Sequence, residues 1–93
     1  MRTRTYRGPT AIHDAETGDH LTDATAVLEP RIDGQNGCWG IITDHSAGEL
    51  PPHLRVTFPD GTAVFVLVDW SDHAGTARVR GGPLPRQLLE ATA

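Results

Sequence analysis

The sequence predicts an all-β fold: a small antiparallel β-barrel or sandwich of about six strands with a short C-terminal tail. Clusters of Gly, Pro and Asp recur at short intervals between apolar runs, which is the spacing of a sandwich or small barrel. One hairpin carries a complete turn signature, and its second strand is apolar on both faces. The length of 93 residues fits a single β domain over residues 1–93.

The expected strands follow one another along the chain and cover residues 3–12, 24–29, 38–43, 55–58, 62–68 and 76–80. Gly8-Pro9 interrupts the first strand, and a proline inside a strand indicates an edge or a bulge. Pro30 ends the second strand, and Asn36-Gly37 forms a turn before the third. Residues 86–93 have helix-forming side chains but are too few to hold a helix alone.

The clearest single feature is the hairpin over residues 55–68. Pro59 presets φ for a type I turn, Asp60 can bond back to the backbone, and Gly61 can take the left-handed position. Its second strand must be covered on both faces, by a second sheet, by Leu88 and Leu89 of the tail, or by a partner chain. Since so short a chain buries little surface, we also expect a homodimer.

Charge and cysteine usage exclude several classes of protein. The net charge is −4, with eight Arg and no Lys, which argues against nucleic-acid binding, and Arg2, Arg4 and Arg7 are expected to be solvated. Cys38 is a lone cysteine, and no apolar run is long enough to cross a bilayer, so we expect a cytoplasmic protein with no membrane partner. Arginine without lysine is typical of a GC-rich bacterial genome.

No catalytic or metal-binding pattern emerges from the residues. Asp44-His45-Ser46 are consecutive, but a catalytic triad converges in space, so we interpret these residues as turn formers. The acidic loop 14–19 misses the calcium-loop pattern, and we expect no metal and no cofactor. His13 and His20, which bracket that loop, are the pair to examine for a metal.

We predict different environments for the two tryptophans. Trp39 precedes Gly40, and we expect its indole to pack in the core over the glycine. Trp70 opens a polar loop, and two interpretations stay open for it: a position at a barrel mouth or an interface, or simple packing. The polar segments at residues 44–48 and 72–75 each follow an apolar strand, so they could line one mouth. The candidate ligand-binding residues are Trp70, His73, His45 and Asp44.

Several short motifs occur in a familiar order along most of the chain: Tyr6-Arg7-Gly8-Pro9, Glu29-Pro30-Arg31-Ile32-Asp33-Gly34, Trp39-Gly40, Gly75, and Gly81-Gly82-Pro83. In these motifs the chain resembles the small actinobacterial domain-of-unknown-function family four-eight-seven-three. The resemblance implies a domain that occurs alone or beside flavin-dependent monooxygenases, and it supplies no catalytic residues. The chain departs from the family in the separation of Trp70 from Gly75 and in the closing Pro83-Leu84-Pro85.

Two functional hypotheses follow. The first is a non-catalytic accessory or binding domain that acts beside a partner protein such as a flavin-dependent oxidoreductase. The alternative is a small β-barrel enzyme of specialised metabolism, a cyclase or isomerase that encloses a small-molecule substrate. Metal storage or sensing is a third possibility.

Overall fold

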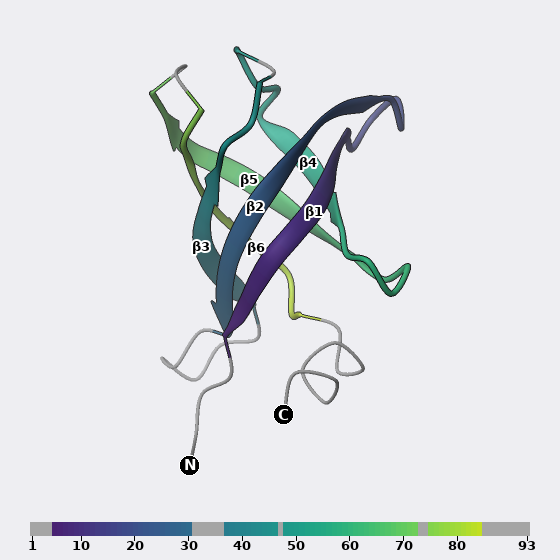
Figure 1. The fold of residues 1–93 in the computed structure, drawn as a ribbon, viewed down its shortest axis with the longest axis vertical. Coiled ribbons are helices and arrows are strands. Elements are labelled where there is room, and N and C mark those ends of the chain that lie inside the picture. Colours follow the sequence, from purple (N-terminus) through teal and green to yellow (C-terminus); the bar gives the residue numbers. More distant parts are fainter. Residues whose placement is uncertain (1–4, 31–36, 47, 73–74, 85–93) are drawn as a thin grey trace.

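The structure is a computed structural model that describes residues 5–30, 37–46, 48–72 and 75–84. These residues form a closed barrel of six antiparallel strands (Figure 1). The strands are β1 (Tyr6–Asp14), β2 (His20–Pro30), β3 (Cys38–Thr43), β4 (His53–Thr57), β5 (Ala63–Ser71) and β6 (Ala77–Gly81). The predicted all-β fold of about six strands is therefore confirmed, as a barrel. The expected C-terminal tail, with Leu88 and Leu89, lies outside the described residues.

The strands follow the order β1-β2-β3-β6-β5-β4 around the barrel, and β4 pairs again with β1. Four of these contacts join strands that are consecutive in the chain. The other two, β3 with β6 and β1 with β4, join strands that are far apart in sequence and close the barrel. The β1–β2, β3–β4 and β5–β6 connections all lie at one end, which is the top of Figure 1.

Strand β1 is continuous through Pro9, whereas the sequence suggested an interruption. It pairs with β2 from Tyr6 onward, but it pairs with β4 only between Ala11 and Asp14. Beside Pro9 the β4 side of β1 has no partner strand, so the missing N–H costs no ladder hydrogen bond on that side. No bulge occurs at Pro9, which pairs regularly with Thr25; the register shift of β1 lies between Ile12 and His13.

The β4–β5 turn has the predicted chemistry. The Gly61 N–H donates to the Phe58 carbonyl oxygen at 3.0 Å, and the Phe58 N–H donates to the Thr62 carbonyl oxygen at 2.8 Å. The Asp60 carboxylate accepts from the Thr62 N–H at 2.9 Å, and Gly61 has φ 91°. The Thr62 hydroxyl, which donates to the same carboxylate at 2.6 Å, and the Thr62 N–H hold Asp60 in its charged form and lower its pKa.

Alternate residues of each strand point into the barrel and fill it. The buried cluster comprises Tyr6, Ile12, Ala24, Ala26, Leu28, Cys38, Ile42, Leu54, Val56, Phe58, Val64, Val66, Val79 and Leu84. At one end the Tyr6 and Phe58 rings meet edge to face, with centroids 4.8 Å apart, and the Tyr6 hydroxyl donates to the Pro9 carbonyl oxygen. The described residues include no helix that could cross a membrane.

One prediction about burial is wrong. Trp39 is not in the core: it lies on the outside of β3 and is 39% exposed. On β5 the described chain covers the inner face, where Val64 and Val66 are buried, while Phe65 and Leu67 are exposed on the outer face, so that cover by the tail or by a partner chain stays a prediction. A barrel wall has one inner surface, so no second sheet is available to cover the outer side of β5.

Gly40 is required by the close approach of β2 and β3. A Cβ at this position would collide with the Val27 carbonyl oxygen and lie 2.9 Å from Leu28 Cα. We expect Gly40→Ala to lower the free energy of unfolding by about 1–3 kcal/mol in urea denaturation, because backbone must shift to admit the methyl group. Gly82→Ala is the control, because nothing lies within 4 Å of its Cβ position. Equal stability of the two variants would contradict the steric account.

Cys38 should be unreactive in the folded protein. Its side chain is fully buried, and burial raises the pKa of the thiol from its ordinary value of 9.0 to about 11. At pH 8 a shift of this size reduces the thiolate fraction about a hundredfold. We therefore expect an aromatic disulfide reagent to modify native protein at least about a hundredfold more slowly than denatured protein. Similar modification rates in native and denatured protein would show that Cys38 is accessible.

The raised pKa of the Cys38 thiol also makes the stability of the fold depend on pH. Because the pKa is higher in the folded than in the unfolded protein, the free energy of unfolding falls as the pH rises from 9.0 toward 11.

Candidate functional site

The outer surface of β3, β6 and β5 carries a group of exposed apolar side chains. The large hydrophobic residues exposed in the described chain are Trp39, Ile41, Phe65, Leu67 and Trp70, at 39%, 39%, 61%, 39% and 55%. All five belong to β3 or β5, and β6 lies between these strands. We call these five residues, together with Arg78 and Arg80 of β6, the aromatic face.

Strand register brings the members of the aromatic face together. Arg80 is paired with Trp39 on one side and with Leu67 on the other. Arg78 is paired with Ile41 and with Trp70 in the same way. Paired residues of neighbouring antiparallel strands lie on the same face, within side-chain reach. The face is therefore a row of two arginines flanked on both sides by apolar side chains.

Trp70 reaches this face because of an irregularity in β5. Without a register shift, the residue opposite Arg78 would be Asp69, since Val68 is paired with Val79. The shift between Val68 and Trp70 adds one residue, so Trp70 takes the position opposite Arg78. The indole is thereby outside the barrel, at 55% exposure.

The polar groups of the face are only partly satisfied within the chain. Arg80 Nε donates to Asp69 Oδ1 at 2.9 Å, and Trp39 Nε1 donates to Glu29 Oε1 at 3.0 Å. Arg78 is exposed and makes no hydrogen bond or ion pair with another described residue. The middle of the face thus presents a guanidinium that no described residue pairs with, on a chain of net charge −4.

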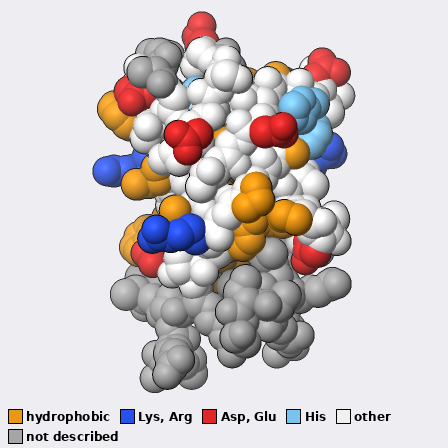
Figure 2. All heavy atoms as spheres, viewed as in Figure 1, with side chains coloured by type: hydrophobic (Ala, Val, Ile, Leu, Met, Phe, Trp, Pro, Cys, Tyr) orange, Lys and Arg blue, Asp and Glu red, His pale blue; other side chains and the backbone are white. Residues whose placement is uncertain are grey.

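Shallow grooves border the aromatic face. A groove of about 320 Å³ is lined by Phe65, Leu67, Arg80, Gly81 and Gly82. A second groove, of about 230 Å³, shares the Phe65 and Leu67 side chains and extends toward His53 of β4. A wider depression of about 460 Å³ lies over β1 and β2, on the surface where Figure 2 shows a cluster of hydrophobic side chains. Asp44, His45 and Trp70 line none of these three grooves.

The β3–β4 and β5–β6 connections lie side by side at the top of the barrel. The His45 N–H donates to the Gly75 carbonyl oxygen at 3.3 Å. The Ser46 N–H donates to Thr22 Oγ1 at 3.1 Å, which ties the first connection to β2. Asp44 takes a left-handed conformation with φ 63°. The β3–β4 connection is therefore bonded both to the β5–β6 connection and to strand β2.

Asp44, His45 and Ser46 do not form a catalytic triad. The His45 ring is 5% exposed, and neither ring nitrogen has a hydrogen-bond partner among the described residues. The Ser46 hydroxyl contacts the Thr22 hydroxyl at 3.2 Å, and the Asp44 carboxylate accepts from Thr43 Oγ1 at 3.4 Å. The arrangement agrees with the interpretation of these residues as turn formers.

Three of the four candidate ligand-binding residues lie within the described residues, and the structure places them at different depths and on different surfaces. Asp44 is exposed at the barrel end, His45 is buried beneath it, and Trp70 is on the outer surface of β5. His73 lies outside the described residues. Sequence reasoning did not identify Arg78 and Arg80 as partners of the tryptophans. The alternation of small apolar residues and arginines over residues 77–81 indicates that Arg78 and Arg80 share one face of a strand. The sequence does not indicate that this strand pairs with β3.

No protein-family model, curated protein or solved structure matches the chain. The resemblance to family four-eight-seven-three therefore stays a prediction.

The burial of the His45 ring without a hydrogen-bond partner among the described residues lowers the free energy of unfolding. A buried polar group without a partner destabilises a protein by about 1–3 kcal/mol. We expect His45→Leu to raise the free energy of unfolding by an amount in this range, because an apolar side chain of similar volume needs no hydrogen bonds. His53→Leu, at an exposed position, is the control and should change stability by no more than about 0.5 kcal/mol. A destabilised His45→Leu protein would indicate that the imidazole makes a polar interaction that the leucine cannot replace.

Proposed function

We propose that the chain is a non-catalytic accessory domain that binds a partner protein through the aromatic face. The observation that carries this proposal is the exposure of five large hydrophobic side chains on one side of the barrel. Clustered exposed apolar side chains on a small domain mark interaction sites more often than chance, and Trp and Arg are the residues that most often dominate binding energy. The aromatic face holds both tryptophans of the chain and two of its eight arginines.

Charge favours a partner protein over a second copy of the chain. Arg78 and Arg80 run along the middle of the face, between the apolar residues of β3 and β5. Two copies packed face to face about a central two-fold axis would bring these arginines toward one another, and like charges in an interface are costly. A partner that presents carboxylates within an apolar patch complements the face. The resemblance in sequence suggests the class of partner: a flavin-dependent monooxygenase, because domains of the family that the chain resembles occur beside such enzymes.

The barrel interior does not favour the enzyme alternative. An enclosing cyclase or isomerase needs a cavity of a few hundred Å³ within the barrel. Here buried side chains from all six strands meet in one cluster, and the grooves of the described residues lie on the outer surface. We therefore carry forward the binding hypothesis alone.

The proposal is tested by titrating the purified monooxygenase with the untagged domain in a calorimeter. We expect Arg78→Glu and Trp70→Ala each to weaken binding at least about tenfold, because they remove the free cation and an indole anchor. Arg7→Glu, an exposed charge reversal on β1, is the matched control and should bind as the wild type does.

Absence of binding by the wild-type domain, or equal binding by all variants, would contradict the proposal. Light scattering of the same samples tests whether a second copy of the chain binds the aromatic face instead. A wild-type dimer that becomes monomeric in Arg78→Glu and Trp70→Ala would assign the face to a second copy and overturn the choice of a different protein.

A further inference from the structure

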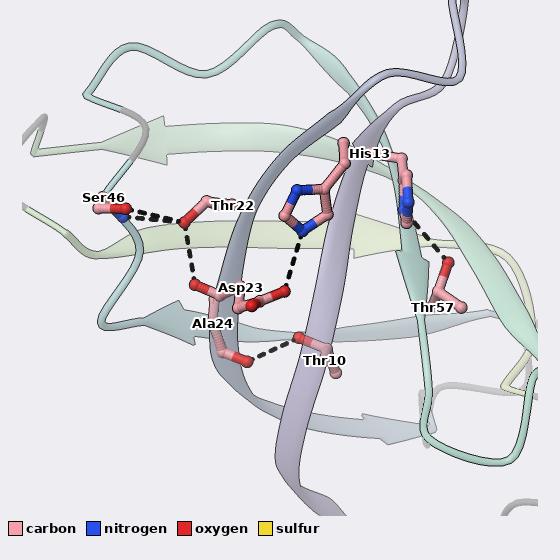
Figure 3. A network of polar contacts seen from close by, with 8 residues as sticks. Thr10, His13, Thr22, Asp23, Ala24, Ser46 and Thr57 are labelled. Carbon is pink, nitrogen blue, oxygen red and sulfur yellow. Dashed lines mark hydrogen bonds and ion pairs between the residues drawn. The ribbon is translucent and has the colours of Figure 1, made fainter.

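Two histidines face each other across the β1–β2 hairpin, beside the register shift. His13 of β1 is paired with His20 of β2, and their ring centroids are 5.3 Å apart with an interplanar angle of 71°. Figure 3 shows the surroundings of His13, with Thr57 on one side and Asp23 of β2 on the other. Both side chains are reachable from solvent, since His20 is exposed and His13 is half-buried.

One nitrogen of each ring is held by a neighbouring side chain. His20 Nε2 donates to Asp23 Oδ1 at 2.9 Å, so the lone pair of the neutral ring lies on Nδ1. His13 Nδ1 contacts Thr57 Oγ1 at 3.4 Å, and when Nδ1 donates in this contact the lone pair lies on Nε2 (Figure 3). The other nitrogens, His20 Nδ1 and His13 Nε2, have no hydrogen-bond partner among the described residues.

This is the arrangement found around metal-binding histidines, which as a rule donate their second N–H to a carboxylate or another polar group. With metal–nitrogen bonds of about 2.0–2.1 Å and tetrahedral angles, two imidazoles on one ion have ring centroids about 5 to 6 Å apart. The observed separation of 5.3 Å falls in that range. The spacing of the two rings is therefore compatible with two imidazole ligands on one ion.

We propose that His13 and His20 form a binding site for a divalent transition-metal ion of the zinc, copper or nickel class, for which imidazole is a suitable ligand. No group of three or more His, Cys, Asp or Glu side chains in the described ranges is placed to hold a metal. The protein thus supplies two ligands, and water or an added ligand completes the coordination. Such an open ion can also take a ligand atom from another molecule.

The charges around the pair set the strength of the site. The Asp23 carboxylate stabilises a bound dication through His20. Arg55 of β4 is paired with His13 and opposes the dication, because its guanidinium carries a like charge. The site is therefore a weak, exchangeable one rather than a structural centre.

The proposal is tested by calorimetric titration of the untagged protein with zinc chloride and with nickel chloride in a buffer that does not chelate metals. We expect one ion per chain. His13→Ala and His20→Ala should each weaken binding by more than tenfold, and Asp23→Asn should weaken it by about tenfold because the acceptor of the His20 N–H loses its negative charge. His53→Ala removes an exposed histidine of the neighbouring strand β4, which is not one of the two proposed ligands, and should leave the affinity unchanged.

Thermal unfolding supplies a second readout. Added zinc should raise the midpoint of the wild type and of His53→Ala, but not that of the His13→Ala/His20→Ala double variant. Circular dichroism verifies that each variant keeps the wild-type fold. The proposal is overturned if neither metal binds at millimolar concentration, or if the affinity is the same after both histidines are removed.

Discussion

The pairing of β1 with β4 is the constraint on which the rest of the structure depends. Only four residues of each strand take part, Ala11–Asp14 with Leu54–Thr57. This short ladder converts a curved sheet into a barrel, and closure gives every strand one inner and one outer face. The inner faces form the buried cluster, and the apolar residues of β3 and β5 that do not fit inside are left on the outside. The aromatic face is therefore a product of closure.

Closure also restricts how a partner can bind. Each described strand has a neighbour on both sides along part of its length, so a long free edge for strand addition is lacking in this part of the chain. Recognition must then rely on side chains: indole and guanidinium groups on the aromatic face, and imidazoles at the β1–β2 hairpin. These two surfaces are built from different strands and can act independently of each other.

Local features of the fold could be predicted from the sequence, whereas features that depend on long-range pairing could not. Pro59-Asp60-Gly61 sets its own turn, and Cys38–Thr43 has the predicted bounds. Trp39 was misplaced because β3 is apolar on both faces, so its alternation does not reveal which face points inward. The position of Trp70 depends on one extra residue in β5, because this residue moves the side chains that follow it to the opposite face of the strand. The contact between His13 and His20 depends on the register of a hairpin whose loop lacks a standard turn sequence.

The order of strands around the barrel has a consequence for how the chain folds. Strand β6 fits between β3 and β5, although it is the last strand in sequence. The barrel wall is thus incomplete until residues 77–81 have been synthesised, and β5 has no neighbour on one side until then. Folds dominated by such long-range pairing form slowly, in milliseconds to seconds. During that interval β5, apolar on both faces, is the segment most prone to misassociation, with Asp60 and Asp69 as its charged flanks. Slow refolding with aggregation that depends on protein concentration is the expected kinetic signature, and stopped-flow tryptophan fluorescence can measure it.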